Sequence, residues 1–311
     1  MTTAVATRDA ELKPATTSAS ALQPRWWMGG FSSAMAAIVT HPLDSLKVRM
    51  QTMTVTSSVV STLRSVIASE GPFVLYKGLE ASMLRQVTYS TARFGVYEEA
   101  KKRIASSSLN DFSPLLARIA AASIGGVVGG VVGTPADLTN VRMQADGQLP
   151  PTQRRGYKTA FHGLYNIAKH EGPRALFTGL GPNVIRAIPM TAGQIATYDT
   201  VKAEMLASGY FRDNLTTHFL ASVAGAFAAT TLCAPIDVIK SRIMAQKGVE
   251  YAGTWDCAKQ IARKEGFLAF FRGWTPAFAR LGPHTILTFM IMEQVKKAYY
   301  SSSVRSGAQS Q

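Results

Sequence analysis

Charged side chains are scarce in this chain. Of its 311 residues, only 17% are Asp, Glu, Lys or Arg, against about 25% in average soluble domains. Long uncharged stretches accompany this deficit, and residues 119–136 and 219–236 contain no charge at all. Each is nearly as long as the about 20 residues that cross a bilayer as a helix. The composition therefore argues against a soluble helical-repeat protein and favours a membrane protein.

The sequence also lacks the residue groupings that bind metals or catalyse reactions. Cys233 and Cys257 provide neither a disulfide framework nor metal-ligand spacing, and the five histidines form no cluster. Gly179 and Gly181 are not followed by the third glycine of a dinucleotide-binding loop. We therefore expect no metal, no cofactor and no enzymatic activity. The net charge of +14 is dispersed and contains no basic run, so we expect no nucleic acid as a partner.

What the sequence does contain is one short pattern that occurs three times. It reads Pro-x-Asp-x-x-Lys, with Asn replacing Lys in the second copy, and it begins at Pro42, Pro135 and Pro235. A motif repeated at this scale indicates one structural unit present three times. Each proline follows a long uncharged stretch, so we expect it to kink a helix in an apolar setting.

Two further motifs recur in the same phase. An acidic residue with glycine, then an aromatic-x-Gly step, occurs within 70–78, 171–179 and 265–273. Each repeat closes with an acid three residues before a lysine. These closing pairs are Glu98 and Lys101, Asp199 and Lys202, and Glu293 and Lys296. Any single motif could be a chance match, but three motifs in register are hard to explain by chance.

Each repeat reads as a long helix, a loop with a short helix, and a second long helix. Three repeats then predict an all-α membrane protein with six transmembrane helices around a central cavity. Small residues at four-residue spacing, such as Gly125, Gly129 and Gly133, predict close helix packing. The expected boundaries are a disordered leader over 1–24, repeats over 25–110, 111–208 and 209–303, and a disordered tail over 304–311.

The charged residues of the two outer motifs predict two ionic rings. An unpaired charge inside a membrane is costly, and threefold pseudosymmetry lets the acid of one repeat meet the cation of the next. In this pairing Asp44 faces Asn140, which gives a hydrogen bond in place of an ion pair. Alternating closure of two rings is the natural mechanism of a transporter. The first ring, here the motif ring, is Asp44, Lys47, Asp137, Asn140, Asp237 and Lys240; the second, here the terminal ring, is Glu98, Lys101, Asp199, Lys202, Glu293 and Lys296.

Three arginines at equivalent positions predict an anion site. Arg85, Arg186 and Arg280 each lie seven residues after the loop glycine, near the middle of the expected span. Ionisable residues at that depth are normally functional, and guanidinium groups suit carboxylate, phosphate or sulfate. The alternative is that each arginine bonds a backbone carbonyl and only tightens the packing. Further candidates are Arg93, Thr88, Tyr89 and Gln194, together with His284, for which a core hydrogen bond is the alternative.

The three motifs together resemble those of the mitochondrial carrier family, over residues 25–300. The stretches 134–144, 153–157 and 282–289 are most similar to its dicarboxylate-carrying branch. This resemblance implies electroneutral exchange of malate or succinate for phosphate, sulfate or thiosulfate across the mitochondrial inner membrane. It also implies that both termini face the intermembrane space, so that the motif ring is a matrix gate and the terminal ring a cytoplasmic gate.

The family pattern carries over with some departures. Its glutamine braces below the matrix gate map onto Gln51 and Gln144, whereas Met244 stands at the third position. Asn140, Thr178 and Met292 replace a cation, a loop cation and an aromatic residue. The alternatives are an oxoglutarate/malate carrier, an uncoupling-protein-like anion or proton carrier, and a non-transporting membrane scaffold. We expect small anions and membrane lipid, with cardiolipin as a candidate, as partners of a monomer.

Overall fold

The computed structural model describes residues 26–54, 57–105, 113–248 and 250–308, and within these ranges it contains helices and turns but no strand. Six helices are long, with 27 to 35 residues each. They are α1 (Trp26–Thr52), α3 (Leu79–Ala105), α5 (Pro114–Ala145), α7 (Leu180–Ala207), α8 (Leu215–Ala245) and α10 (Trp274–Ala308).

A short helix and a 3-10 turn separate the two long helices of every repeat. The short helices are α2 (Val59–Glu70), α6 (Ala160–His170) and α9 (Thr254–Lys264), followed by η2 (Pro72–Tyr76), η5 (Pro173–Phe177) and η6 (Phe267–Phe271); η3 (Asp146–Gln148) and η4 (Pro151–Gln153) extend the second loop. The predicted order of long, short and long helix is confirmed in all three repeats.

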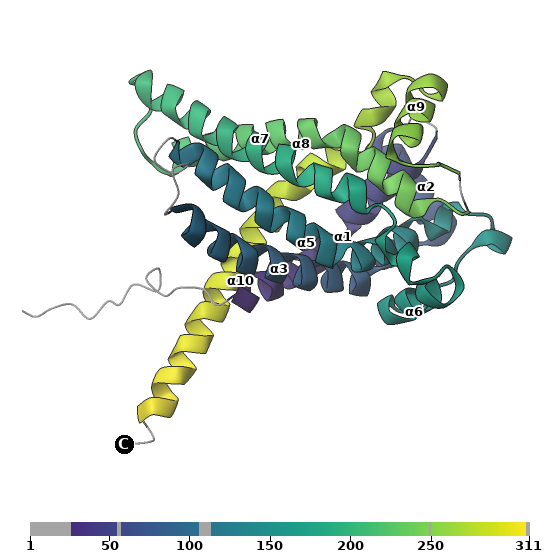
Figure 1. Ribbon diagram of the computed structural model, residues 1–311, viewed down its shortest axis with the longest axis horizontal. Coiled ribbons are helices and arrows are strands. Elements are labelled where there is room, and N and C mark those ends of the chain that lie inside the picture. The colour runs from purple at the N-terminus through teal and green to yellow at the C-terminus, as the bar shows by residue number, and fades with distance from the viewer. Residues whose placement is uncertain (1–25, 55–56, 106–112, 249, 309–311) are drawn as a thin grey trace, which may run out of the picture.

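The long helices lie side by side around one axis, as Figure 1 shows. Each packs against its neighbours in the order α1, α3, α5, α7, α8 and α10, and α10 returns to α1 to close the circle. The helices α2, α6 and α9 gather at one end (Figure 1). At the other end, the start of α1 lies against α10, where the Trp27 and Tyr299 rings are 6.0 Å apart.

Two of the long helices have the length and composition of membrane spans. These segments are Pro114–Gln148 and Thr216–Ala245. At about 1.5 Å per residue, even a 27-residue helix is about 40 Å long, which exceeds the about 30 Å of a bilayer core. The presence of six transmembrane helices stays a prediction for the other four.

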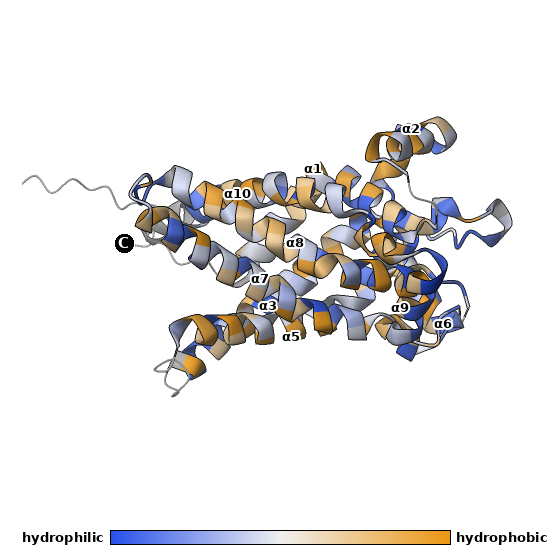
Figure 2. Cartoon of the chain, turned by 90° about the horizontal axis from the view of Figure 1, so that it is seen from above, coloured by the Kyte–Doolittle hydropathy of each residue, from blue (hydrophilic) through white to orange (hydrophobic). Residues whose placement is uncertain are grey.

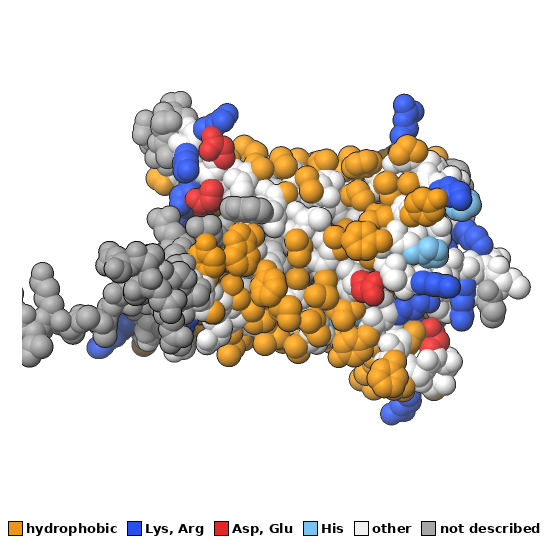
Figure 3. Space-filling view, turned by 90° about the horizontal axis from the view of Figure 1, so that it is seen from below, with side chains coloured by type: hydrophobic (Ala, Val, Ile, Leu, Met, Phe, Trp, Pro, Cys, Tyr) orange, Lys and Arg blue, Asp and Glu red, His pale blue; other side chains and the backbone are white. Residues whose placement is uncertain are grey.

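The outer surface is consistent with a lipid environment. Figure 3 shows hydrophobic side chains across the middle of one face, with most Lys, Arg, Asp and Glu side chains toward its two ends. Figure 2 shows the same separation along the helices, with hydrophilic residues concentrated near α6 and α9. Phe94, Ile124, Ile185 and Phe227 are among the large apolar side chains that are exposed.

Small residues bring α5 close to α3, as predicted. A Cβ atom added to Gly125 would lie 2.8 Å from the Arg93 carbonyl oxygen, and one added to Gly129 would lie 2.9 Å from the Tyr89 carbonyl oxygen. Real Cβ atoms do not approach so closely, so glycine is required for this packing. The close approach fixes the backbone of the helix that carries Arg85.

The loop glycines explain why the aromatic-x-Gly step recurs. Gly78, Gly179 and Gly273 have φ values of 89°, 84° and 74°, a region that glycine adopts readily. Each also presses against the end of a long helix of the next repeat. A Cβ atom at Gly179 would lie 2.8 Å from the Met244 side chain, and one at Gly273 would lie 2.9 Å from the Gln51 side chain.

The predicted domain boundaries are only partly covered by the described residues. The leader over 1–24 lies outside them. Helix α10 continues to Ala308, which lies inside the predicted tail over 304–311, and the disorder of that tail stays a prediction. The repeat boundaries stay predictions.

Candidate functional site

The three motif prolines lie inside continuous helices: Pro42 in α1, Pro135 in α5 and Pro235 in α8. Proline removes one backbone hydrogen bond at each place. Each helix continues through its proline, so the kinks predicted there stay predictions. The acid of each motif follows its proline by two residues and lies on a stretch where α1, α5 and α8 contact one another.

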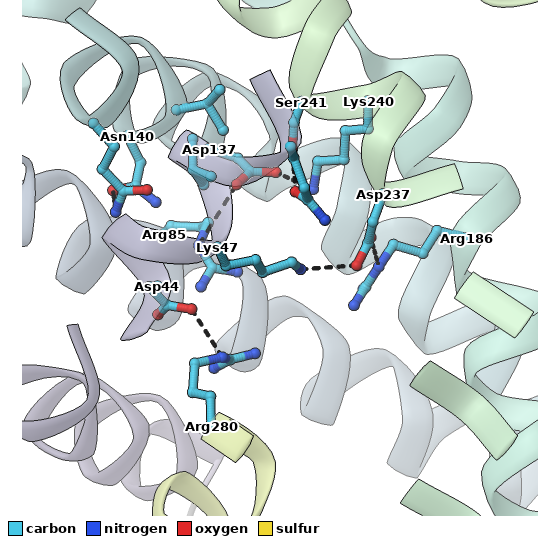
Figure 4. A pocket seen from close by; sticks show the side chains of 14 residues that line it. Asp44, Lys47, Arg85, Asp137, Asn140, Arg186, Asp237, Lys240, Ser241 and Arg280 are labelled. Atoms are coloured by element: carbon cyan, nitrogen blue, oxygen red, sulfur yellow. Dashed lines mark hydrogen bonds and ion pairs between the residues drawn. The ribbon is translucent and has the colours of Figure 1, made fainter. Parts of the chain in front are cut away.

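Two of the three predicted pairs of the motif ring are present. The Lys47 ammonium lies 2.8 Å from the Asp237 carboxylate, and Lys240 forms an ion pair with Asp137. Each pair joins the acid of one repeat to the lysine of another, as Figure 4 shows. The Asn183 side-chain oxygen also accepts a hydrogen bond from Lys240 at 3.0 Å.

The third predicted contact, between Asp44 and Asn140, is wrong for this conformation. Asp44 pairs with the Arg280 guanidinium at 2.8 Å, and the Asn140 side-chain oxygen accepts a hydrogen bond from the Gln144 amide at 3.0 Å. No hydrogen bond between Asp44 and Asn140 occurs among the described residues. The physical reason is that Asn140 bonds within its own helix and carries no charge to attract the carboxylate, unlike the lysines at the equivalent positions.

All three predicted anion-site arginines reach carboxylates of the motif ring. Arg85 lies 3.6 Å from Asp137, and Arg186 lies 2.5 Å from Asp237. With Arg280 on Asp44, every arginine meets the acid of a neighbouring long helix. The alternative that they bond only backbone carbonyls is therefore wrong. The anion site and the motif ring, which the sequence suggested as separate, form one cluster.

This cluster lines a pocket between the long helices, seen in Figure 4. In their ordinary charge states, its five cations outnumber its three carboxylates by two. Charges about 4 Å apart interact by about 4 kcal/mol at an effective dielectric constant of about 20, so this excess attracts anions strongly. The pocket is thus suited to a small anion with two negative charges. Its charged members are Lys47, Lys240, Arg85, Arg186, Arg280, Asp44, Asp137 and Asp237.

His284 is held by hydrogen bonds at the contact of α10, α1 and α3. Its Nδ1 atom lies 3.2 Å from the Thr40 hydroxyl, and its Nε2 atom lies 3.3 Å from the Ser33 hydroxyl and 3.4 Å from the Gln86 amide. These contacts support the core hydrogen bond that was the alternative to ligand binding. Because His284 lies one turn after Arg280, the network also positions that arginine.

The other predicted ligand residues lie outside the pocket lining. The Thr88 hydroxyl donates to the Leu84 carbonyl of its own helix at 2.8 Å. The Arg93 guanidinium lies 5.9 Å from the centre of the Tyr89 ring, and Gln194 is exposed. Their participation in binding stays a prediction.

The terminal ring is open in this conformation. Asp199 accepts a hydrogen bond from Arg118 at 2.8 Å, and Lys202 lies 3.0 Å from Asp213, so both ring members have partners outside the ring. Across the described residues, no ion pair joins one terminal-ring residue to another. One closed ring and one open ring are what alternating closure requires.

The glutamine braces differ between the two positions. The Gln51 side-chain oxygen accepts a hydrogen bond from the Ser241 hydroxyl at 2.7 Å, which ties α1 to α8. Gln144 instead bonds Asn140 within α5. Only the first of these hydrogen bonds connects two repeats.

A set of three arginine–glutamate pairs was missed by the sequence reasoning. Arg49, Arg142 and Arg242 each bond both oxygens of the glutamate in the acidic-Gly motif: Glu70, Glu171 and Glu265. Hydrogen bonds from the guanidinium groups hold the pKa of all three glutamates below the usual value. The overlooked signal was an arginine two residues after the motif-ring cation position in every repeat.

Two of these arginines also connect neighbouring repeats. The Nε atom of Arg142 donates to the Met244 carbonyl, and that of Arg242 donates to the Gln51 carbonyl, each at 3.2 Å. A second layer of bonds thus lies next to the motif ring.

A bundle of three helix–loop–helix repeats closed by ionic pairs at one end, with a cationic pocket on its axis, defines a solute transporter. A family model described as "Mitochondrial carrier protein" matches residues 20–108, 111–208 and 211–303. The chain belongs to the mitochondrial carrier family, whose members are transporters and not enzymes, and this places it in the mitochondrial inner membrane.

Three curated relatives cover nearly the whole chain. "Mitochondrial citrate transporter F" of Aspergillus niger is 49% identical over 279 residues, covering 88% of this chain and 89% of the relative. "Probable mitochondrial 2-oxoglutarate/malate carrier protein" of Dictyostelium discoideum is 47% identical, covering 91% of each. "Mitochondrial dicarboxylate carrier" of Caenorhabditis elegans is 43% identical, covering 91% and 97%.

Proposed function

We propose that this protein is an antiporter that exchanges dicarboxylates such as malate and succinate for inorganic phosphate, sulfate or thiosulfate. The names of relatives from Caenorhabditis elegans and Saccharomyces cerevisiae, both dicarboxylate carriers or transporters, support the dicarboxylate substrates. The observation that carries the proposal is the pocket in which cations exceed carboxylates by two. Malate, succinate, sulfate and thiosulfate are dianions near neutral pH, and each would balance that excess.

The proposed mechanism is competition for the arginines. A substrate dianion that enters the pocket offers carboxylate or sulfate oxygens to Arg85, Arg186 and Arg280, which now bond the motif-ring acids. Each acid that loses its arginine is held more weakly, so binding loosens the closed ring. A charge left unpaired in a buried site is unfavourable by several kcal/mol, so the empty carrier favours the closed ring.

We assign the motif ring to the matrix gate and the terminal ring to the cytoplasmic gate, with both termini in the intermembrane space. The meeting of Trp27 and Tyr299 at the end that carries the terminal ring supports a common side for the two termini. With the motif ring closed and the terminal ring open, this conformation would accept substrate from the intermembrane space. We further propose a monomer surrounded by lipid, including cardiolipin.

Two other substrates are favoured by specific relatives. The Dictyostelium relative is named for 2-oxoglutarate and malate, and 2-oxoglutarate is also a dianion. The Aspergillus relative is named for citrate, which carries one more carboxylate than malate. A pocket with two excess cations balances a dianion better than a trianion.

The test is counter-exchange by the purified protein in liposomes loaded with malate. We expect uptake of labelled malate, succinate and phosphate that depends on internal malate. Liposomes without internal substrate and liposomes with Arg186→Ala protein are the controls. Uptake of 2-oxoglutarate but not phosphate would select the alternative exchange, and absence of malate exchange would refute the proposal.

A further inference from the structure

The two lysines of the motif ring are held by different numbers of partners. Lys47 donates to Asp237 at 2.8 Å, and the described residues provide no second acceptor for its ammonium. Lys240 forms an ion pair with Asp137 and also donates to the Asn183 side-chain oxygen at 3.0 Å. Asp137 lies in α5 and Asn183 lies in α7, so two helices of the second repeat hold a lysine of the third.

The orientation of the Asn183 amide follows from its other two contacts. Its nitrogen donates to the Gly130 carbonyl oxygen at 3.1 Å and to the Thr134 hydroxyl at 3.0 Å, and both residues lie in α5. A carbonyl only accepts hydrogen bonds, and the Thr134 hydroxyl gives its own proton to that carbonyl at 2.6 Å, so it accepts from Asn183. The amide nitrogen is therefore directed at α5, and the oxygen is left to face Lys240.

This amide is buried, which makes its contacts hard to exchange. Asn183 is only 7% exposed, and Thr134 is fully buried. Water cannot readily replace a partner that the amide loses, and a buried polar group without a partner is unfavourable. The bond to Lys240 is also charge-assisted and hence stronger than a bond between two neutral groups. The network thus joins α5, α7 and the lysine of α8.

The first and third repeats lack this arrangement. Asn183 lies three residues before the anion-site arginine of its repeat, and the matching residues of the other repeats are Ser82 and Ala277. Alanine has no polar side chain, and the Ser82 hydroxyl is buried without a hydrogen-bond partner among the described residues. The second acceptor is therefore particular to the contact that Lys240 closes.

We propose that Asn183 is a positioning residue of the motif ring, which holds the Lys240 ammonium against Asp137 and so stabilises closure of this end. Asn183 does not line the pocket, so it acts through the lysine and not on the substrate. A lysine has a flexible four-carbon stem, and two acceptors on different helices select the conformation that reaches Asp137. This inference rests on the proposed alternation of the two rings.

The same geometry gives Asn183 a part in opening. Helices α5 and α7 belong to one repeat, so the amide stays on α5 when α8 moves away. Lys240 then loses both of its acceptors together, whereas Lys47 loses one. The contact of α5 with α8 is therefore harder to open than the contact of α8 with α1.

The experiment measures how fast a maleimide labels one introduced cysteine in the detergent-purified protein. The cysteine replaces Val141, which lines the pocket one turn beyond Asp137 and is buried in this conformation. The native Cys233 and Cys257 are replaced by alanine in every sample, and this protein is the parent. Asn183→Ala should be labelled about tenfold faster than the parent, the change that one charge-assisted hydrogen bond can supply.

The matched control is Ser82→Ala. It truncates the equivalent residue of the first repeat, whose hydroxyl has no partner to lose. We expect this variant to be labelled at the parent rate.

A double-mutant cycle separates positioning from a general role in stability. Lys240→Met removes the ammonium, so Asn183→Ala should add little to the labelling rate of that protein if the amide acts through the lysine. Lys47→Met breaks the other lysine contact and should still add its effect, which verifies that the rate can rise further. The melting temperature should fall with Asn183→Ala in either protein, because the bonds to α5 are lost in both.

Thr134→Val keeps the test open if Asn183→Ala does not fold. It retains the amide and the lysine but removes one acceptor of the amide nitrogen, so we expect a smaller rise in the labelling rate. Parent rates in both variants, or equal acceleration by Asn183→Ala with and without Lys240, would overturn the positioning role. Labelling needs no substrate, so a parent protein that closes and labels as expected but exchanges no malate would refute only the proposed function.

Discussion

The two ends of the helix bundle carry the same kinds of residues but differ in their partners. At the motif ring, lysines and arginines from neighbouring long helices meet three acids and close the axis. At the terminal ring, Asp199 and Lys202 pair with Arg118 and Asp213, which are not ring members. The two terminal-ring residues of the second repeat thus have partners outside the ring. Closing the ring requires these ion pairs to be exchanged for pairs between ring members.

The closed end is also reinforced by bonds that lie beside the motif ring. Gln51 with Ser241, and Arg142 and Arg242 with backbone carbonyls, join one repeat to the next beside the motif ring. Opening the motif ring therefore breaks more than ion pairs. We infer that the closed state of the motif ring depends on the hydrogen bonds beside the ring as well as on the ion pairs within it.

The largest effect is expected from removing an arginine that belongs to both the ring and the anion site. Arg186→Ala leaves Asp237 with one cation less and removes a ligand of the substrate. Losing one partner of a buried ion pair is unfavourable by about 3–5 kcal/mol, so exchange should fall by at least about a hundredfold.

The measurement is liposome exchange by Arg85→Ala, Arg186→Ala and Arg280→Ala proteins, with size-exclusion profiles to verify folding. The corresponding lysine variants should also be poor, because a point charge does not replace the guanidinium fork. Near-normal uptake by all three alanine variants would show that the cluster is not the binding site.

A smaller effect is expected at the glutamates that support the closed end. Glu265 accepts hydrogen bonds from both Arg242 and Arg272, so Glu265→Gln should destabilise the protein by about 1–3 kcal/mol. Glu171 is more exposed and bonds one arginine, so Glu171→Gln should cost less. Thermal unfolding in detergent measures both, and equal losses would contradict this ranking.

These glutamates also predict the sign of a pH effect. Their pKa is lowered in the folded protein by the arginines that bond them. They therefore stabilise the fold above the unfolded pKa of about 4.3, and this contribution is lost as the pH falls through the lower folded value. Glu265→Gln should weaken this acid sensitivity, and an unchanged melting-temperature profile would refute the assignment.

The sequence predicted the repeats and the ring members, but not all of their partners. Periodic motifs determine where helices begin, and α3, α7 and α10 begin directly after the predicted loop glycines. They also predicted Lys47 with Asp237 and Lys240 with Asp137, because these pairs follow from symmetry. The pairing of Asp44 with Arg280 was missed although it obeys the same symmetry, because the sequence assigned the arginines to a separate anion site.

A still smaller effect is expected from restoring the missing ring cation. Asn140→Lys would place an ammonium opposite Asp44 and add a third ion pair to the motif ring. The existing Asp44–Arg280 pair already satisfies part of that carboxylate, so the gain is moderate. We expect a population shifted toward the closed motif ring and an altered exchange rate. State-selective labelling of single introduced cysteines measures the shift, and Asn140→Gln is the control without charge.

The smallest effect is expected at the open end, where Asp213 holds Lys202. The Lys202 ammonium lies 3.0 Å from Asp213 and keeps the pKa of that carboxyl below its usual value. The His218 ring also reaches Asp213, at 2.9 Å. Asp213→Asn removes the charge that keeps Lys202 away from the terminal ring, so the lysine becomes free to meet a ring acid.

Because this pair is exposed and screened by salt, its loss should shift the equilibrium only slightly toward closure of the terminal ring. Cysteine labelling at the terminal-ring end should slow in Asp213→Asn at low ionic strength, and the difference should shrink as salt is added. Glu99→Gln breaks a comparable exposed pair with Arg103 and serves as the control. Equal labelling rates for wild type, Asp213→Asn and the control at low salt would show that Asp213 does not compete for the ring lysine. The openness of that end would then follow from helix packing alone.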